Sequence, residues 1–170
     1  MVMWQKKRGR DPEEHEVSEP QSEALQNIQM MIDSPADMSE APPFVRGMDL
    51  SGLSFTKVDF GHFEMEWRVD AHLTHYDGIV QGGVVNVIAD SGQSFAFYST
   101  SREPEAYSTS EFTTRFLRPI QAGDTIHVVN EVVNRSKRLC IIETRMYNRD
   151  TGKLCAMVTG TWMMADRELG

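Results

Sequence analysis

The most apolar part of the chain follows a pair of glycines and predicts a buried helix. Across residues 84–98 the apolar positions cover most of a helix circumference, which is typical of a central helix rather than a surface helix. Polar residues interrupt this segment along one stripe, at Asn86, Asp90 and Gln93/Ser94, where helical spacing puts them on a common face. A carboxylate in so apolar a helix has to be paired, hydrated or functional. Asp90 is therefore the first candidate for a functional residue.

Strict alternation marks a strand before this helix. In residues 62–69, Phe63, Met65 and Trp67 alternate with polar side chains, the period of two that one buried and one wet face require. The preceding run LSFTKVDF also has strand character, and Phe60-Gly61 predicts the bend of a hairpin. We expect the apolar face of this hairpin to pack on the long helix.

Four further strand-like runs follow the helix, at residues 107–117, 125–133, 139–147 and 154–164. The links PIQAGD, NRSKR and NRDTGK are short and turn-like, which favours antiparallel pairing of strands in chain order. The sequence therefore predicts a hairpin, one long helix and a four-stranded meander. Six antiparallel strands on a single buried helix make an α+β architecture.

The residues before the first strand fall into two parts, an arm and a helix with its connector. Residues 1–20 carry a basic block, an acidic block and two prolines, which predicts a disordered or loosely attached arm. A helix capped by Ser22 and a proline-rich connector are expected within residues 21–44. The main domain then covers residues 45–166.

Length and charge exclude several functional classes. A chain of 170 residues is long enough for one domain with a real core. A net charge of −8 and a pI near 5.1 argue against a general nucleic-acid-binding protein, which needs a basic surface. No apolar run reaches the roughly 18 residues of a membrane span, and the basic N-terminus lacks the apolar stretch of a signal peptide. We expect neither a nucleic-acid nor a membrane partner.

The cysteines and histidines predict neither a disulfide nor a metal site. Cys140 and Cys155 lie in predicted strands and are out of register if the last hairpin turns at residues 148–153. Reduced thiols in the cytoplasm are the simplest interpretation. The five histidines and two cysteines show no zinc-ligand spacing. Phosphate-binding loops, nucleophile elbows and dinucleotide fingerprints are also absent from the sequence, so we expect no metal and no cofactor.

One stretch resembles a known family. His75-Tyr76-Asp77-Gly78-Ile79-Val80-Gln81-Gly82-Gly83, with Asp90 nine residues after Gln81, is similar to the signature N-x-x-G-x-x-H-G-G plus a helical acid. That signature belongs to the hotdog-fold thioesterases, in particular the phenylacetate-pathway (PaaI-like) acyl-CoA thioesterases. The run Phe116-Leu117-Arg118-Pro119 also matches a strand end in that family. The resemblance covers about residues 45–166 and implies a hotdog fold and acyl-CoA hydrolysis.

The residues themselves suit that chemistry. Gly82 and Gly83 open the helix, where free N–H groups and the helix dipole favour a developing oxyanion. Asp90 would serve as general base or as nucleophile, and both roles stay open. The resemblance implies a strand hydroxyl beside the acid, for which we choose Thr109, with Ser108 and Ser110 as competitors.

The remaining candidates depart from the family pattern or have weaker support. Gln81 stands where the family carries histidine and is expected to orient the turn, and His75 stands where some members place asparagine. His75 is a candidate to contact the attacking water. Ser94 shares the face of Asp90 and is a candidate for substrate binding or for pairing with the carboxylate. Arg118 and Arg138 suit the phosphates of coenzyme A.

Helix geometry predicts a shared site. Eight residues separate Gly82 from Asp90, which is about 12 Å along a helix. One chain therefore cannot easily bring both to one carbonyl. We expect a homodimer with Gly82 from one chain and Asp90 from its partner, as the resemblance also implies, and dimers of this family often pair into tetramers.

Two other functions compete with hydrolysis. The first is a non-catalytic acyl-CoA-binding sensor on the same fold. Such sensors usually carry a DNA-binding module, and the region before the first strand has one good helix, too little for a helix-turn-helix. The second is a dehydratase, which would need a catalytic histidine with an acid, and the His75/Gln81 pattern does not supply it. The acyl group itself is not encoded in any motif.

Overall fold

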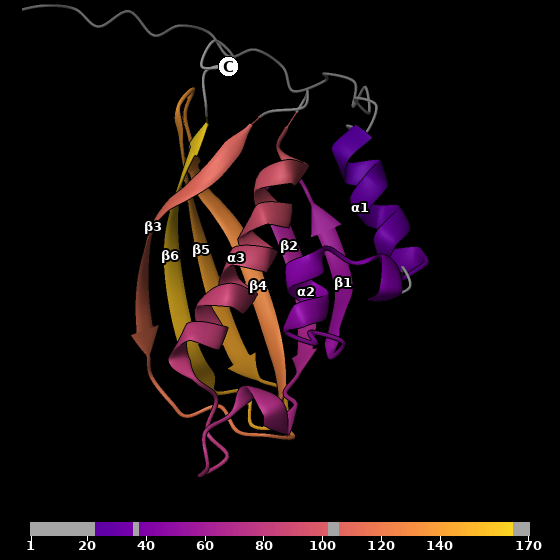
Figure 1. The fold of residues 1–170 in the computed structure, drawn as a ribbon. Coiled ribbons are helices and arrows are strands. Elements are labelled where there is room, and N and C mark those ends of the chain that lie inside the picture. The colour runs from indigo at the N-terminus through magenta and orange to yellow at the C-terminus, as the bar shows by residue number, and fades with distance from the viewer. Residues whose placement is uncertain (1–22, 36–37, 102–105, 165–170) are drawn as a thin grey trace, which may run out of the picture.

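One antiparallel sheet of six strands wraps a long helix in the computed structural model, which describes residues 23–35, 38–101 and 106–164 (Figure 1). The long helix is α3 (Gly82–Ser99), and it lies along the concave face of the sheet. The strands are β1 (Leu53–Asp59), β2 (His62–Arg68), β3 (Tyr107–Phe116), β4 (Thr125–Arg135), β5 (Leu139–Asn148) and β6 (Leu154–Met164). The predicted α+β class, the six strands and the long helix are confirmed.

Shorter helices complete the described chain. They are α1 (Glu23–Asp33), α2 (Pro43–Gly47) and the 3₁₀ turns η1 (Met38–Glu40) and η2 (Ala71–Leu73). Helix α1 packs against β1 and α3 and buries Ala24 and Ile28 there. It therefore covers the β1 edge of the sheet, on the side opposite to β3 (Figure 1). The expected arm over residues 1–20 and the expected cap at Ser22 lie outside the described residues.

The hairpin before the helix forms as predicted. Asp59 pairs with His62 across the turn at Phe60-Gly61, and Gly61 adopts a positive φ of 72°, which glycine reaches at no steric cost. On β2 the alternate side chains of Phe63, Met65 and Trp67 are almost completely buried. Each such burial stabilises the fold by about 1.5–3 kcal/mol. One face of this hairpin therefore supplies a large part of the core.

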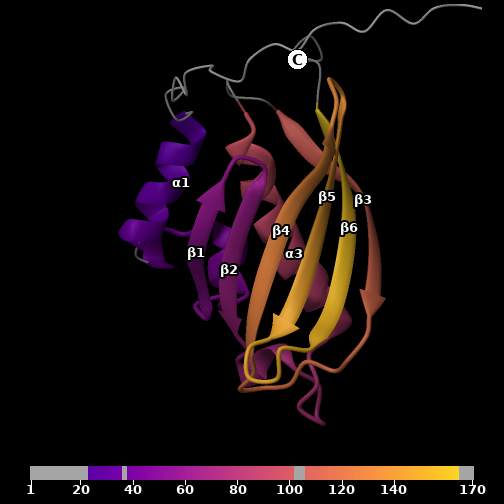
Figure 2. The ribbon, with the colours of Figure 1, turned by 180° about the vertical axis from the view of Figure 1, so that it is seen from behind.

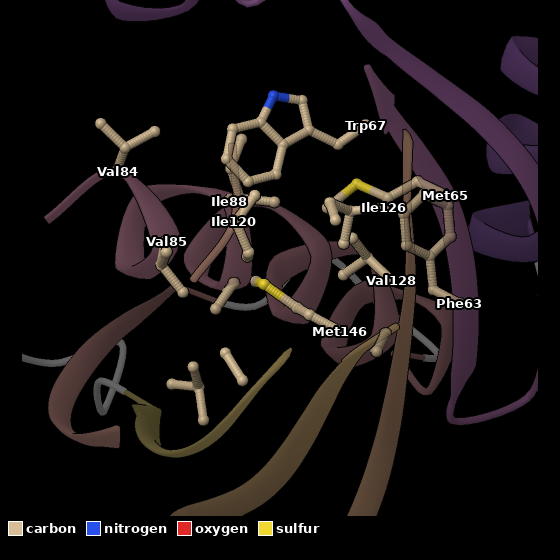
Figure 3. Packing of buried hydrophobic residues seen from close by; sticks show 14 of the residues in the cluster. Phe63, Met65, Trp67, Val84, Val85, Ile88, Ile120, Ile126, Val128 and Met146 are labelled. Atoms are coloured by element: carbon tan, nitrogen blue, oxygen red, sulfur yellow. The ribbon is translucent and has the colours of Figure 1, made fainter. Parts of the chain in front are cut away.

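The core lies between this apolar face and α3. Figure 3 shows side chains of β2 and β4 directed at Val85 and Ile88 of α3, with Met146 of β5 closing the cluster. Val84, Val85, Ile88, Ala89, Ala96 and Phe97 of α3 are all buried. The apolar circumference predicted for this helix thus has a direct cause, because the sheet curves around it.

The predicted four-stranded meander is confirmed for β4, β5 and β6, which pair in chain order, but it is wrong for β3, which does not pair with β4. The strand order is β1-β2-β4-β5-β6-β3, so β3 pairs with β6 and β4 pairs with β2 (Figure 2). The link between β3 and β4 does not close a hairpin turn, because its backbone bonds to the loop before α3. The Val80 N–H donates to the Ile120 carbonyl at 2.9 Å, and the Ala122 N–H donates to the Gly78 carbonyl at 3.0 Å. The link therefore crosses the end of the sheet and leaves β3 at the far edge.

Both cysteines are buried and do not form a disulfide with each other, as their registers predicted. Cys140 in β5 lies opposite Trp162 of β6, several positions away from Cys155. Among the described helices, none is long and apolar enough to cross a membrane.

Candidate active site

Asp90 is held by a residue of the neighbouring edge strand. Its side chain is half-buried on α3, and its Oδ1 accepts a hydrogen bond of 2.7 Å from the Thr109 hydroxyl of β3. A carboxylate that accepts such a bond keeps a defined orientation, and bonds to charged groups are worth about 1.5–3 kcal/mol. The structure thus brings together two of the predicted site residues, 19 positions apart in the chain.

A bulge in β3 aims Thr109 at the helix. The pairing with β6 shifts between Thr109 and Glu111, so that Ser110 is the extra residue on this strand. Bulges bend a strand and redirect its side chains. Thr109 is half-buried, whereas the two competing hydroxyl residues, Ser108 and Ser110, are exposed. Only Thr109 of the three contacts Asp90 among the hydrogen bonds of the described residues.

A second contact docks β3 on the same helix face. The Thr114 hydroxyl donates to Asn86 Oδ1 at 2.5 Å, one helical turn before Asp90. Ser94, one turn after Asp90, instead donates its hydroxyl to the Ser91 carbonyl within the helix at 2.7 Å. The polar stripe predicted on α3 therefore faces β3 through Asn86 and Asp90. Ser94 is half-buried, and its hydrogen bond is local to the helix.

A cluster of packed aromatic rings lies near Asp90. Tyr107 of β3 packs against Phe97 and Trp162, with ring centroids 4.4 and 5.6 Å away. Burial raises the pKa of the Tyr107 phenol, and the neighbouring Tyr98 and Asp90 side chains raise that pKa further. The phenol therefore stays neutral at physiological pH, so it adds no negative charge near Asp90.

The two glycines open α3 at the other end of the site. Gln81 is the N-cap residue, and its side chain makes no capping hydrogen bond. The turn is held by backbone contacts instead, from the Gln81 N–H to the Leu73 carbonyl and from the Val84 N–H to the Gln81 carbonyl. The N–H groups of Gly82 and Gly83 lie in the first turn, where the helix provides no acceptor for them.

A pocket borders this helix start. It has a volume of about 360 Å³, and Ile79, Val80, Gly82, Val85, Phe116, Leu117, Arg118, Pro119, Ile120 and Ala156 line it. The Phe116 ring lies directly against Gly82, because a Cβ added to Gly82 would come within 3.1 Å of the Phe116 Cζ. Any larger residue at position 82 would meet this ring. The lining is apolar except for backbone groups and the Arg118 side chain.

The other predicted residues lie at varied distances from this pocket. Arg118 borders it, is exposed and donates from Nη1 to the Leu154 carbonyl at 2.5 Å. Arg138 lies at the opposite end of the sheet, beside Leu139, which pairs with Met163 near the end of β6. His75 is exposed in the loop before α3, where its backbone bonds to Ile79 and Gly78. Within one chain, Arg118 and Arg138 therefore cannot bind the same phosphate group.

The glycine pocket and the carboxylate lie apart in one chain. Both belong to the single helix α3, so the eight residues between Gly82 and Asp90 correspond to about 12 Å. The pocket lining also excludes Asp90 and Thr109. Within one chain, the pocket at Gly82 and the Asp90–Thr109 pair are therefore not in contact with one another.

Two features of this site were missed by sequence reasoning. The partnership of Asn86 with Thr114 has no sequence signal beyond the polar stripe on the helix. Phe116 was visible only as part of a strand-end motif, and its contact with Gly82 depends on β3 lying at the sheet edge. Clusters of three or more residues suited to a metal ion do not occur among the described residues.

The chain is similar in sequence to one protein family and to one named relative. The sequence model of the family described as "Thioesterase superfamily" matches residues 77–155. A Saccharolobus solfataricus protein, named as a candidate esterase, is 29% identical over 113 residues, 66% of this chain and 73% of the relative.

Solved structures agree on the fold. The PaaI protein of the E. coli phenylacetic acid degradation operon superposes with a TM-score of 0.68 at 23% identity, covering 84% of this chain and 94% of that one. A Streptococcus mutans protein solved with bound acetyl-CoA superposes with a TM-score of 0.65 at 17% identity, covering 76% of this chain and 97% of that one. The wrapped helix and sheet are thus a hotdog fold, and the resemblance seen in the sequence is confirmed.

Proposed function

We propose that this chain, which carries a hotdog domain of the thioesterase superfamily, hydrolyses acyl-CoA thioesters to a free acid and coenzyme A. The observation that carries the proposal is the half-buried Asp90 held by Thr109 on the apolar helix α3. Its half-exposure on α3 leaves the Asp90 carboxylate open to substrate and water, as a reactive group has to be. The bound acetyl-CoA of the Streptococcus mutans relative supports a coenzyme A ester as the ligand class.

The start of α3 supplies the half of the site that stabilises the oxyanion. A thioester carbonyl that enters the pocket near Gly82 can accept from the N–H groups of Gly82 and Gly83. These donors and the helix dipole stabilise the oxyanion that forms in the transition state. Removing one such donor costs roughly 10²–10³ in rate. Glycine at position 82 keeps this approach open, because a side chain there would meet Phe116.

Asp90 supplies the half of the site that activates water or attacks the carbonyl carbon. As general base it takes a proton from water while the water oxygen bonds to the carbonyl carbon. The tetrahedral intermediate then collapses, its C–S bond breaks, and the thiolate of coenzyme A leaves and takes up the proton. As nucleophile, Asp90 would instead form a mixed anhydride that water hydrolyses. Label in Asp90 after a single turnover in ¹⁸O-labelled water would identify the anhydride route, because only water that attacks the Asp90 carbonyl carbon of the anhydride can leave its oxygen there.

A homodimer joins the two halves. Gly82 and Asp90 are about 12 Å apart on α3, so one carbonyl needs Gly82 of one chain and Asp90 of the other. The edge strand β3 carries Thr109 and pairs only with β6 among the described strands. Free strand edges invite pairing with another chain. Phe116 and Leu117, 58% and 47% exposed, lie at its end and add an apolar contact surface.

Two further expectations belong to the same proposal. Pairs of such dimers would assemble into a tetramer through a surface that no motif identifies. Cys140 and Cys155 do not pair with each other, which suits a reducing compartment, so we place the reaction in the cytoplasm. Arg118 at the pocket mouth is the candidate contact for a coenzyme A phosphate, with Arg138 of the second chain as a candidate for another.

The test compares the wild type with Asp90→Asn on a panel of aryl- and alkyl-CoA thioesters, with thiol release as the readout. Asparagine keeps the shape and can still accept from Thr109, but it cannot take a proton. We expect turnover by the wild type and a loss of at least about 10²-fold in the variant. Asp59→Asn, an exposed turn residue on β1, serves as the matched control and should keep the wild-type rate.

The competing function makes a different prediction. A non-catalytic acyl-CoA-binding protein would bind the thioesters with the pocket at Gly82 and release no thiol in either form. Equal turnover by the wild type and Asp90→Asn would instead remove Asp90 from the mechanism while leaving the hydrolase. The retained acid on α3 favours catalysis over binding alone.

A further inference from the structure

Helix α3 carries a buried amide that the proposed reaction does not use. Gln93 is completely buried, three residues after Asp90, and does not line the pocket. An uncompensated amide in such a core would cost several kcal/mol. In the described part of the chain, however, no buried side-chain nitrogen or oxygen lacks a hydrogen-bond partner.

Gln93 is the centre of a chain of hydrogen bonds under the helix. Its Oε1 accepts from Trp162 Nε1 of β6 at 2.8 Å. Its Nε2 donates to the Thr144 hydroxyl of β5 at 2.9 Å and to the Val158 carbonyl of β6 at 3.2 Å. All the polar atoms of this one side chain are thus bonded to the adjacent strands β5 and β6 behind α3.

The chain continues across the sheet. The Thr144 hydroxyl donates to Asn130 Oδ1 of β4 at 2.7 Å, and Asn130 Nδ2 donates to the Phe63 carbonyl of β2 at 3.1 Å. Four strands are therefore linked to one residue of α3 by directional bonds. In a low-dielectric core such a network is strong when every member is satisfied.

Two glycines bring the helix close enough for these bonds. A Cβ on Gly160 of β6 would lie 2.0 Å from Gln93 Oε1, and one on Gly92 of α3 would lie 2.4 Å from Asn130 Nδ2. Neither position has room for a side chain. Glycine at both positions therefore lets α3 lie close enough to the sheet for the buried amide of Gln93 to make its bonds.

The bonds define how α3 is rotated about its axis. Hydrogen bonds are directional, so the bonds of Gln93 hold for only one rotation of α3. Three residues along a helix correspond to a turn of about 60° from Asp90 to Gln93. When Gln93 faces the sheet, Asp90 is directed to the edge strand, where it meets Thr109.

We propose that Gln93 is a positioning residue, which acts through the rotation of α3 to hold Asp90 against Thr109 and in line with the thioester. This inference rests on the proposed hydrolysis, because it concerns the reach of Asp90. Gln93 touches neither the pocket nor Asp90 directly, so its loss should affect turnover more than substrate binding. A misplacement of about 1 Å can cost 10²-fold in rate.

The test separates positioning from stability with two variants. Gln93→Met has similar length, removes the amide and leaves Trp162 Nε1 without an acceptor. Gln93→Met/Trp162→Phe removes both partners, and replacing both by apolar groups can be nearly neutral for stability. We expect kcat to fall about 10–10²-fold in both variants, with KM changed less than about twofold. Unfolding by urea should show that the double variant regains stability without regaining kcat.

Ser99→Ala is the matched control for destabilisation of the same helix. The buried Ser99 hydroxyl accepts from the Gly61 N–H at 2.9 Å, and Ser99 lies about 13 Å along α3 from Asp90. We expect it to lower stability and to keep kcat. Wild-type kcat in the double variant, or an equal loss of kcat in Ser99→Ala, would overturn the inference. A wild type without turnover would instead overturn the proposed function itself and this inference with it. Full activity of Asp90→Asn would leave the hydrolase, but it would remove Asp90 from the mechanism and so overturn this inference.

Discussion

Thr109 and Asp90 show how much a single hydroxyl contributes at the residue scale. The hydroxyl donates to the carboxylate from an edge strand, across 2.7 Å, in a half-buried setting. A carboxylate on a helix has several rotamers, and only some of them reach a neighbouring chain. The bond from Thr109 selects one of them before substrate arrives.

We predict that Thr109→Val lowers kcat by about tenfold or more, because a hydrogen bond to a charged group is worth about 1.5–3 kcal/mol. Valine keeps the β-branched shape, so β3 should fold normally. Thr113→Val is the matched control, since Thr113 is an exposed threonine of the same strand. Steady-state kinetics on the preferred thioester provide the measurement. Equal rates in the two variants would show that the Thr109 hydroxyl plays no part.

At the element scale, the sheet has two unlike faces. The inner face of β2 is apolar, whereas Glu64 on its outer face accepts from His62 Nε2 and from His127 Nε2 of β4, each at 2.7 Å. Burial alone would raise the pKa of the Glu64 carboxyl. The hydrogen bonds from His62, His127 and Lys57 together outweigh burial and lower that pKa from 4.5 to about 2. The outer face is thus tied together across β1, β2 and β4 by charge.

The lowered pKa of Glu64 predicts an acid-dependent loss of stability. Because the folded-state pKa lies below the unfolded value, the contribution of Glu64 is complete above about pH 4.5 and disappears as the pH falls towards about 2. We expect Glu64→Gln to be less stable than the wild type near pH 6, and the difference to close at acid pH. Urea unfolding across this range measures it, with the exposed Glu40→Gln as control. A difference that does not change with pH would contradict this origin.

At the scale of the whole molecule, the two parts of the proposed site lie apart along one helix. Gly82 begins α3 and Asp90 lies in its middle, while the sheet edge that carries Thr109 has no partner strand on its outer side among the described strands. A two-fold axis beside β3 would bring the half-site of each chain to the complementary half of the other. Such isologous pairing is the commonest form of protein assembly.

If each active site is shared between two chains, mixing two inactive variants should restore part of the activity. Asp90→Asn should be inactive for want of the acid, and Gly82→Val because its side chain meets Phe116. In a mixed dimer, one site has an intact Gly82 and an intact Asp90 from different chains, while the other has neither. Random mixing should therefore restore about a quarter of the wild-type activity. Activity that stays at the level of the separate variants would show that each site lies within one chain.

Local patterns were enough for most of the fold. The alternation in residues 62–69 identified the buried face of β2, and the apolar circumference of residues 84–98 identified α3, because both patterns reflect burial of adjacent positions. The order of strands was not accessible in the same way. The link after β3 has the composition of a turn, and only its bonds to the loop before α3 direct β4 to the other side of the sheet.

The same division holds for the candidate site. The sequence by itself determined the elements, the helix start at Gly82 and the choice of Asp90 as the candidate functional residue, since helical spacing and a charge in an apolar segment are local properties. Only the tertiary structure decided which hydroxyl meets Asp90, that Phe116 covers Gly82, and that Gln93 faces the sheet. These contacts join residues 19 to 69 positions apart in the chain. Their geometry depends on strand order, on a bulge and on two close-packed glycines, which no local pattern encodes.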